Sequence, residues 1–469
     1  MEIIAEKTFT AADQDSFAAL SGDANPLHLD EVAARRTIFG FPVVHGMHLL
    51  CWALESWFGN QTGPPRALVK LSASFDRGVL VGETVHAAVV KGGENFTVMI
   101  RRDQATMLSI RGELGPPVAY GEALPPLNPT RCRVIDFAAA SEARGALALS
   151  YSATRAGRLF PQLSAALPAW QVAALLATTR LVGMECPGLH SLYSAMNITF
   201  DRVASGAPEM NFHVESADPR FGLLRLAVRG PGFHGRLTAF VRPAPCRQAG
   251  IHELARLVER GEFAGQRAVV IGGSRGLGEV TAKLLAVGGA EVMVTYYCGK
   301  EDAEAVAAEI RAGGGQCRVV PFDATRPTPV ATMLPPTHLY YFATPHIDSD
   351  KTVVFSSERF AEYCRYYVTG FVQTLLQVAQ GAPTLEVLYP STAFLDEPAH
   401  MAEYCAAKAA GEEVCRQLAS RLPAWHIQAP RLPRMLTDQN SGLLPVKTDA
   451  PEIVILPHLR GMNQNLARH

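Results

Sequence analysis

The sequence carries almost no net charge. Its 44 acidic and 43 basic residues leave a formal charge of −1 at pH 7. Because the opposite charges are so evenly balanced, they create no overall field that would attract nucleic acid or an anionic membrane, and we expect neither as a partner. Recognition must therefore depend on local sites.

Closely spaced cysteines are missing too. The nine cysteines stand singly, without a Cys-x-x-Cys pair or the spacing of a metal site. This pattern argues against a disulfide framework, predicts no bound metal and is typical of a reducing compartment. No run of about 18 apolar residues is present either, so no membrane span is expected. Residues 1–14 lack the basic start and apolar core of a secretory signal, and cytoplasm is the expected location.

What the sequence does contain is enough material for several folded cores. It has 469 residues, of which 48% are apolar and 19% are charged, as in folded proteins. Domains of about 100–200 residues suggest roughly three units. Changes of pattern place these units at residues 1–125, 126–245 and 265–469, with a linker at 246–264 that carries a short helix.

The first two units show the same order of elements. In residues 1–125, an apolar helix at 43–59 precedes four stretches that alternate apolar and polar residues. Such alternation, broken by glycine-containing turns, predicts an antiparallel sheet around one central helix, an α+β arrangement. Residues 126–245 repeat the order with an apolar helix at 161–184, which predicts a second copy of the fold.

The last unit alternates strands with helices. The compact strand RAVVIGG is followed by a helix, and further strands and helices alternate up to about residue 324. This alternation predicts parallel βαβ units and a doubly wound α/β sheet.

A glycine-rich loop, IGGSRGLGE, joins the first strand of this unit to its first helix. Glycines let the chain turn sharply and bring backbone N–H groups close to a pyrophosphate at the helix N-terminus. The position between strand and helix therefore predicts a dinucleotide site. Its expected contacts are Gly272, Ser274, Arg275, Gly276, Leu277 and Gly278.

Three residues nearer the C-terminus extend this pattern. Tyr404 and Lys408 are four apart, on one face of a predicted helix, and Ser391 precedes them. With the glycine loop, this set resembles the short-chain dehydrogenase/reductase family, from roughly residue 267 to the end. The resemblance implies a Rossmann-type sheet and a nicotinamide cofactor. It also implies that Tyr404 and Lys408 contact the cofactor, that Ser391 orients a carbonyl substrate and that Asp323 contacts the adenine.

The expected chemistry is reduction of a ketone. A free tyrosine has a pKa near 10, too high for efficient proton exchange near neutrality, so Lys408 is expected to lower the pKa of Tyr404. NAD-binding proteins usually carry an acid that binds the ribose 2′-hydroxyl. No acid stands at the end of the second strand before Glu301, whereas Arg275 and Lys300 could meet a 2′-phosphate. NADP(H) is therefore the predicted cofactor.

The unit departs from the family pattern in three places. Residues 342–345 read FATP in place of Asn-Asn-Ala-Gly, Tyr367 replaces the asparagine that supports a proton relay, and the Pro-rich stretch 325–336 shortens a helix. These changes leave two interpretations open, an active reductase and a degenerate one kept for assembly.

The longest composite motif lies near the N-terminus, in SGDANPLHLD. Asp23, Asn25, Pro26 and His28, followed by FGFPVVHGM at 39–47, resemble the (R)-specific enoyl-CoA hydratases, which are MaoC-like hot-dog proteins. A polar turn ahead of a helix would explain Asp23 and Asn25 but not the rest.

Hydration of an enoyl thioester needs an activated water and a proton for the α-carbon. Asp23 and His28, on one short loop with Asn25, could hold that water and carry both proton transfers. The N–H of Gly46, at the start of the central helix, could stabilise charge on the thioester oxygen. His45 beside it is expected to be a packing residue.

The resemblance assigns different tasks to the two hot-dog copies. Residues 1–125 would form the catalytic domain. Residues 126–245 lack the Asp–Asn–His set and would form a second, non-catalytic hot-dog that pairs with the first and covers the acyl tunnel. The fold class predicted for the chain is thus a double hot-dog followed by a Rossmann-type parallel sheet.

The two predicted activities share an intermediate, an (R)-3-hydroxyacyl thioester. The sequence therefore predicts a bifunctional enzyme of fatty-acid or polyketide-type biosynthesis, which reduces a 3-oxoacyl thioester with NADPH and dehydrates the product to a trans-2-enoyl thioester. The acyl group would be carried by CoA or by an acyl carrier protein, and a homodimer or homotetramer is expected. Two alternatives stay open. One is the reverse direction, and the other is a dehydratase whose degenerate reductase unit is a scaffold for an acyl carrier partner.

Overall fold

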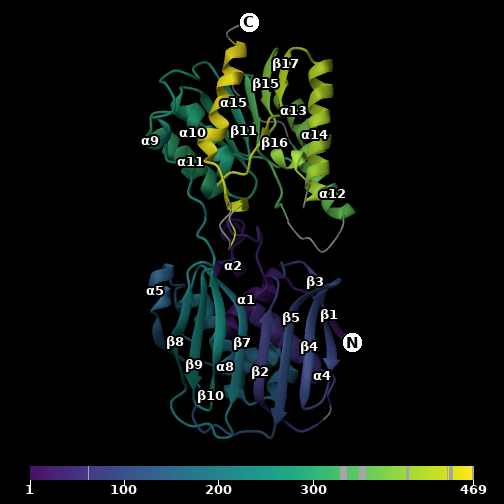
Figure 1. Ribbon diagram of the computed structural model, residues 1–469, viewed down its shortest axis with the longest axis vertical. Coiled ribbons are helices and arrows are strands. Elements are labelled where there is room, and N and C mark those ends of the chain that lie inside the picture. The colour runs from purple at the N-terminus through teal and green to yellow at the C-terminus, as the bar shows by residue number, and fades with distance from the viewer. Residues whose placement is uncertain are drawn as a thin grey trace. The chain divides into compact units, whose positions relative to one another are not determined.

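The computed structural model describes residues 1–61, 63–327, 335–347, 355–397, 401–440, 442 and 447–466 (Figure 1). Most of the Pro-rich stretch predicted to shorten a helix, residues 328–334, lies outside this range. The chain divides into two compact units, with the boundary between Ala244 and Pro245.

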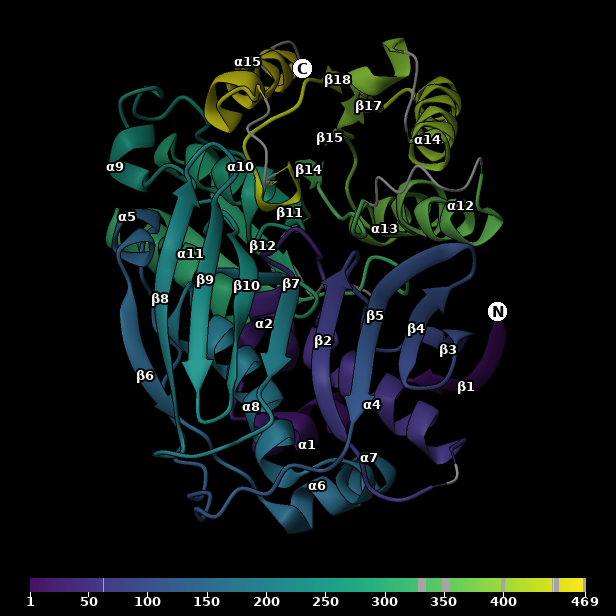
Figure 2. The same ribbon diagram turned by 60° about the horizontal axis from the view of Figure 1, so that its bottom comes forward.

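The first unit is built on one antiparallel sheet of ten strands, in the order β1-β3-β4-β5-β2-β7-β10-β9-β8-β6. Counted from its two edges, the sheet reads β1-β3-β4-β5-β2 and β6-β8-β9-β10-β7, the same order twice. The halves join where β2 pairs with β7, as Figure 2 shows. The predicted duplication is therefore confirmed. The strands are β1 (Glu2–Thr8), β2 (Ala67–Phe75), β3 (Thr84–Lys91), β4 (Asn95–Arg102), β5 (Ala105–Gly115), β6 (Arg144–Ala148), β7 (Ser191–Phe200), β8 (Glu209–Asp218), β9 (Leu223–Gly230) and β10 (Phe233–Val241).

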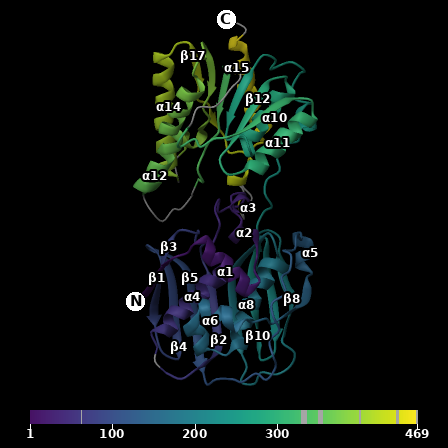
Figure 3. The ribbon, with the colours of Figure 1, turned by 180° about the vertical axis from the view of Figure 1, so that it is seen from behind.

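Each half holds one apolar helix against the sheet, α4 (Gly46–Gly59) in the first half and α8 (Ala169–Arg180) in the second (Figure 3). Burial of their apolar side chains is the main source of stability for such an arrangement. In the first half, for example, Trp57 of α4 stacks on Phe96 of β4, with ring centroids 4.0 Å apart.

The prediction of a single helix at 161–184 is wrong. It is divided into α7 (Pro161–Ala166), α8 and the π-helix η1 (Leu181–Glu185). Pro168 causes the first break, because a proline forces the preceding residue, Leu167, into an extended conformation. The smaller helices of this unit are α1 (Ala11–Ser21), α2 (Pro26–Leu29), α3 (Glu31–Ala34), α5 (Phe137–Ser141) and α6 (Ala153–Leu159).

The second unit has a six-stranded parallel sheet in the order β13-β12-β11-β14-β15-β17. Numbered along the chain, this order is 3-2-1-4-5-6, which confirms the predicted doubly wound arrangement. The strands are β11 (Arg267–Ile271), β12 (Glu291–Tyr296), β13 (Gln316–Pro321), β14 (His338–Tyr341), β15 (Leu385–Leu388) and β17 (Trp425–Gln428), and a separate pair is formed by β16 (Ser391–Thr392) and β18 (Arg431–Leu432).

Helices cover both faces of this sheet. Along β11, Ala268 and Val270 belong to one apolar core, while Val269 and Ile271 belong to the other. In the part of the chain that is described, no helix is both long and apolar enough to cross a membrane. The helices of this unit are α9 (Ile251–Leu254), α10 (Gly276–Val287), α11 (Lys300–Ala312), α12 (Ser357–Cys364), the π-helix η2 (Arg365–Gly370), α13 (Phe371–Val378), α14 (Ala402–Arg421) and α15 (Pro451–Leu466).

Candidate active sites

The Asp–His loop connects α1 to α2 through a short, hydrogen-bonded turn. Gly22 ends α1 with a left-handed backbone, φ +78°, which favours glycine. Asn25 is the N-cap of α2, and its Oδ1 accepts a hydrogen bond from the N–H of Leu27 at 3.0 Å. Pro26 occupies the first helical position, where its lack of an N–H costs nothing. The loop therefore fixes Asp23 and His28 on either side of a helix start.

Asp23 and His28 meet in the structure, as predicted from their spacing. Side-chain ligand atoms of Asp23, His28 and His45 all lie within 4.8 Å of one another. His28 Nδ1 lies 2.6 Å from the carbonyl oxygen of Val43. A carbonyl can only accept, so this contact assigns the proton to Nδ1 and leaves the lone pair on Nε2 available as a base.

Burial shifts the titration of both groups toward their neutral forms. Asp23 is only 2% exposed, and burial raises the pKa of its carboxyl. Burial likewise lowers the pKa of His28, partly opposed by the nearby Asp23 carboxylate. A neutral imidazole beside a carboxyl that holds its proton readily is suited to exchange of protons with a substrate.

His45 does more than fill space. It is fully buried, its Nε2 lies 2.9 Å from the backbone oxygen of Asp23 and its Nδ1 lies 2.9 Å from Oε1 of Gln14. Its ring also stacks on His28, with centroids 3.8 Å apart. The prediction of a packing residue is therefore incomplete, because His45 also holds the loop. With both its nitrogens near oxygen atoms, His45 is poorly placed to help bind a metal ion.

The second hot-dog copy contributes to this site, which the sequence did not indicate. Thr179 Oγ1 donates a 2.7 Å hydrogen bond to Oδ2 of Asp23. Asn25 Nδ2 donates to the carbonyl oxygens of Gly183 at 2.9 Å and Gly188 at 3.2 Å. These partners are more than 150 residues away in the sequence, so no local spacing could have revealed them.

Gly46 stands where the oxyanion contact was predicted. It is the first residue of α4, so its N–H has no acceptor within the helix. A Cβ atom at this position would lie 2.8 Å from Cδ1 of the Phe75 ring, which explains the need for glycine. Its role toward a thioester stays a prediction.

In the second unit, the glycine loop forms a narrow turn between β11 and α10. Gly272 has φ +76°, and a Cβ there would lie 3.0 Å from the backbone of Phe342. A Cβ on Gly278 would lie 2.3 Å from the carbonyl oxygen of Gly272. The backbone packs so closely at these two positions that only glycine fits, and such a tight turn before a helix is typical of a pyrophosphate site at the helix start. Of the other predicted contacts, Ser274 lies in the same turn, and Gly276 and Leu277 are the first two residues of α10.

Two other predicted cofactor contacts already have partners in the chain. Arg275 Nη1 lies 3.7 Å from Oδ2 of Asp438, a nearly buried carboxylate. Asp323 Oδ1 accepts hydrogen bonds from the N–H and the hydroxyl of Thr325, at 2.8 and 2.7 Å. Asp323 therefore shapes the turn after β13, and its contact with adenine stays a prediction.

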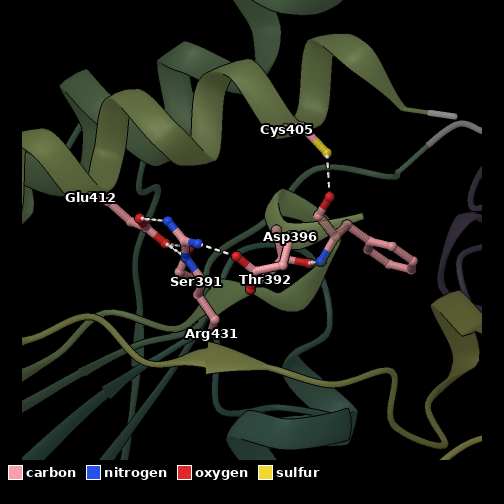
Figure 4. A network of polar contacts seen from close by, with 7 residues as sticks. Ser391, Thr392, Asp396, Cys405, Glu412 and Arg431 are labelled. Carbon is pink, nitrogen blue, oxygen red and sulfur yellow. Dashed lines mark hydrogen bonds and ion pairs between the residues drawn. The ribbon is translucent and has the colours of Figure 1, made fainter. Parts of the chain in front are cut away.

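Ser391, Tyr404 and Lys408 lie in one region of the second unit, but their contacts differ from the expectation. Lys408 Nζ donates to the carbonyl oxygen of Pro390 at 2.8 Å and lies 6.0 Å from the centre of the Tyr404 ring. Ser391 Oγ donates to Oε1 of Glu412 at 2.5 Å. Figure 4 shows that Arg431 binds the same carboxylate, with its Nη2 2.7 Å from Oε2.

The expected pKa relation between Tyr404 and Lys408 is wrong for this structure. Burial raises the pKa of Tyr404 to about 12 and lowers the pKa of Lys408 to about 7. A lysine with this pKa is only about half protonated near pH 7, so it favours the phenolate of its neighbour less than a fully charged ammonium would. Both shifts have one cause, the apolar and aromatic surroundings of this part of the sheet.

Two departures from the family pattern contact each other. The hydroxyl of Tyr367 lies 2.5 Å from that of Thr344, within the FATP segment. The Tyr367 ring also lies beneath Lys408, whose Nζ is 3.9 Å from the ring centre. Tyr389 donates to the carbonyl oxygen of Tyr367 at 3.0 Å. A cluster of tyrosines thus surrounds Lys408 where the family pattern has an asparagine.

Comparisons with known proteins match the two ends of the chain separately. Residues 2–110 match the MaoC like domain family, and residues 266–335 match the short chain dehydrogenase family. The chain is 46% identical over 85 residues to an (R)-specific enoyl-CoA hydratase of Aeromonas caviae, which covers 18% of this chain and 62% of that protein. It is 31% identical over 87 residues to a 3-hydroxybutyryl-CoA dehydratase of Methylorubrum extorquens, covering 18% and 55%.

These matches span less than two thirds of the relatives' own length. Among solved structures, a short chain dehydrogenase from Burkholderia cenocepacia in complex with NADP is 23% identical, covers 38% of this chain and 78% of that chain, and has a TM-score of 0.35. An alternative dihydrofolate reductase from Brucella suis in complex with NADP is 18% identical, covering 44% and 90%, with a TM-score of 0.36.

Proposed function

Because the chain joins a MaoC-like domain to a short-chain dehydrogenase domain, we propose that it is a bifunctional reductase and dehydratase of acyl thioesters. The reductase would convert a 3-oxoacyl thioester to the (R)-3-hydroxyacyl thioester, and the dehydratase would convert that product to a trans-2-enoyl thioester. The observation that carries the proposal is the pair of buried Asp23 and half-buried His28, with ligand atoms within 4.8 Å, in a chain that also contains Ser391, Tyr404 and Lys408.

In dehydration, one group must take the α-proton while another protonates the leaving hydroxyl. His28 offers a bare Nε2 and a lowered pKa, so it is assigned the role of base. Asp23 has a raised pKa and is assigned the role of acid. The N–H of Gly46 would then stabilise the charge that develops on the thioester oxygen. The experiment that tests this half is the formation of an enoyl thioester from an (R)-3-hydroxyacyl-CoA by the full chain.

The residues of the second unit fit a nicotinamide dinucleotide. Gly272 and Gly278 shape the tight turn at the start of α10, whose N-terminal N–H groups are assigned the pyrophosphate, and Lys408 is assigned the nicotinamide ribose. When bound, NADPH supplies the hydride. Tyr404 would give a proton to the alkoxide oxygen, and Ser391 would donate a hydrogen bond to the same oxygen after releasing Glu412.

We expect Arg275→Ala to weaken NADPH binding much more than NADH binding. A contact between the guanidinium and a 2′-phosphate is charge-assisted, and loss of such a hydrogen bond typically costs about 1.5–3 kcal/mol, or roughly 10-fold to 100-fold in affinity. In this case the guanidinium must first leave Asp438, so the effect should lie at the lower end. Fluorescence titration of both nucleotides against parent and variant measures it. Equal weakening of both, or a parent that prefers NADH, would contradict the assignment.

A second candidate is a dehydratase whose reductase unit is a scaffold for an acyl carrier partner. The observation that favours it is the engagement of Ser391 by Glu412, together with the lowered pKa of Lys408, about 7, beside the tyrosine cluster. A parent protein that dehydrates but never oxidises NADPH would select it. Both candidates include three further proposals. The acyl group is carried by CoA or by a carrier protein, the reaction runs in the biosynthetic direction, and the protein forms a homodimer or homotetramer.

A further inference from the structure

The carboxyl group of Asp23 lies in a niche made by the second hot-dog copy. Asp23 is 2% exposed and Thr179 is 4% exposed, so their 2.7 Å hydrogen bond is shielded from water. Buried hydrogen bonds to a carboxylate are stronger than exposed ones. Thr179 comes from α8, the central helix of the copy that lacks an Asp–His loop.

The other wall of the niche is Gly183, within the π-helix η1 that follows α8. A Cβ atom on Gly183 would lie 2.2 Å from Oδ1 and 2.6 Å from Oδ2 of Asp23. No real Cβ could share that space with the carboxyl. The backbone of η1 also takes part, because the carbonyl oxygen of Gly183 accepts the Asn25 side-chain N–H. Irregular π-helical turns of this kind are frequent at functional sites.

The first copy provides an internal comparison. Thr179 is the eleventh residue of α8, and the eleventh residue of α4 is Ser56. The Ser56 hydroxyl donates to the carbonyl oxygen of Trp52, within its own helix. Both helices thus carry a hydroxyl at this position, but only the hydroxyl on α8 faces a carboxyl group.

We propose that the dehydratase site is composite, with Thr179 and Gly183 of the second copy acting as positioning residues for Asp23. Thr179 directs one carboxyl oxygen, and Gly183 leaves the space for the other. This inference rests on the proposed function and deepens it, since it gives the copy without the catalytic loop a part in dehydration. When Asp23 gives its proton to the leaving hydroxyl, the Thr179 O–H stabilises the carboxylate that forms.

The same contact sets the pH dependence of Asp23. A donor to the carboxylate lowers its pKa, so removal of the Thr179 hydroxyl should raise it further. The other titratable groups around Asp23 are His28 on α2, His45 on α4 and the thiol of Cys132, and Arg242 at the end of β10 acts on His28. None of them is changed by a substitution at Thr179.

The test compares Thr179→Val, Thr179→Ser and Thr178→Val in the full chain, with an (R)-3-hydroxyacyl-CoA as substrate. Valine keeps the shape of threonine without its hydroxyl, so kcat of Thr179→Val should fall about 10-fold. This loss is smaller than the roughly 100-fold or more expected when an acid–base group itself is removed, because Asp23 is still present. KM should stay within about 2-fold, and the alkaline limb of the pH–rate profile should move to higher pH. Thr179→Ser should restore both. Thr178→Val is the matched control, because that hydroxyl donates to Leu175 within its helix.

Gly183→Ala gives a second test that does not depend on the hydroxyl. Gly183 has no positive φ, so alanine is not strained by the backbone, but its Cβ must displace the Asp23 carboxyl. Its kcat should fall further than that of Thr179→Val. Thermal unfolding of each variant shows whether the fold is kept. If the parent dehydrates while folded Thr179→Val and Gly183→Ala keep the parental kcat and pH profile, the composite site is refuted. A parent without dehydratase activity refutes the proposed function and this inference together.

Discussion

Replacing Asp23 by Asn, or His28 by Ala, is expected to lower dehydration of an (R)-3-hydroxyacyl thioester by at least about 100-fold, as is typical for a lost acid–base group. The asparagine would keep the shape of the loop and could not donate a carboxyl proton. The alanine would remove the base whose Nδ1 lies against the carbonyl oxygen of Val43. Consumption of NADPH with a 3-oxoacyl thioester should be unchanged in both variants, because Ser391, Tyr404 and Lys408 belong to the other compact unit.

Asp30→Asn is the matched control for the loop. Asp30 is exposed and caps α3 by accepting the N–H groups of Val32 and Ala33 at 2.9 and 3.0 Å, and asparagine can cap a helix equally well. This variant should dehydrate at the parental rate. Normal dehydration by both Asp23→Asn and His28→Ala would show that the loop has only a structural role.

Tyr404→Phe should remove 3-oxoacyl reduction, with a loss of at least about 100-fold relative to a slow parent. The substitution deletes only the phenolic proton donor and leaves the ring to pack against Tyr363 and Tyr367, 5.9 and 5.7 Å away. The parent is expected to be slow for two reasons. Its Ser391 must leave Glu412, and the pKa of Tyr404 is raised to about 12. Binding of NADPH should not change greatly.

Tyr366→Phe removes another phenol, from the π-helix η2 that also carries Tyr367, and should leave the reduction rate unchanged. This control shows whether a lower rate in Tyr404→Phe comes from loss of the Tyr404 hydroxyl itself or would follow from loss of any phenol in this region. The measurement is NADPH oxidation with a short 3-oxoacyl thioester, on CoA and on an acyl carrier protein. A parent that binds NADPH but reduces neither substrate would overturn the assignment. The scaffold interpretation would then hold for residues 265–469, and the dehydratase proposal would stand.

Features that depend on local sequence could be predicted. Strands such as β4 and β9 alternate apolar and polar residues, and this alternation is visible over eight residues without knowledge of their partners. The glycine loop could also be predicted, because the positive φ of Gly272 and the contact of Gly278 with the Gly272 carbonyl oxygen arise within one short segment. Asp23 and His28 are only five residues apart, on either side of the start of α2, so their meeting followed from their spacing.

Other elements were missed because their reasons lie outside their own segments. The edge strands β1 and β6 were not predicted. Most of the residues in β6 are exposed, so its sequence lacks the apolar alternation of a buried strand. The helix at 161–184 was predicted as continuous, although Pro168 marks where α8 must begin.

The contacts that control reactivity could not be predicted from the sequence either. The pairing of Thr179 with Asp23 requires the two hot-dog copies to pack against each other, and the link from Ser391 to Glu412 requires β16 to lie against α14. The same holds for the pKa of Lys408, since the sequence analysis considered only the effect of Lys408 on the pKa of Tyr404. Burial beside Tyr367 and Tyr389 decides it instead, and burial can be seen only in the folded chain.

In the proposed function, the two halves of the chain act in turn on one acyl thioester. The most direct measurement is to incubate the full chain with a 3-oxoacyl-CoA and NADPH, and to follow NADPH absorbance and product mass together. We expect NADPH to be consumed and the final product to be an enoyl thioester, lighter than the substrate by one oxygen atom. With His28→Ala, the reaction should stop at the 3-hydroxyacyl thioester. A parent that leaves the 3-oxoacyl thioester unchanged, or that stops at the 3-hydroxyacyl thioester as the variant does, would contradict the proposed function.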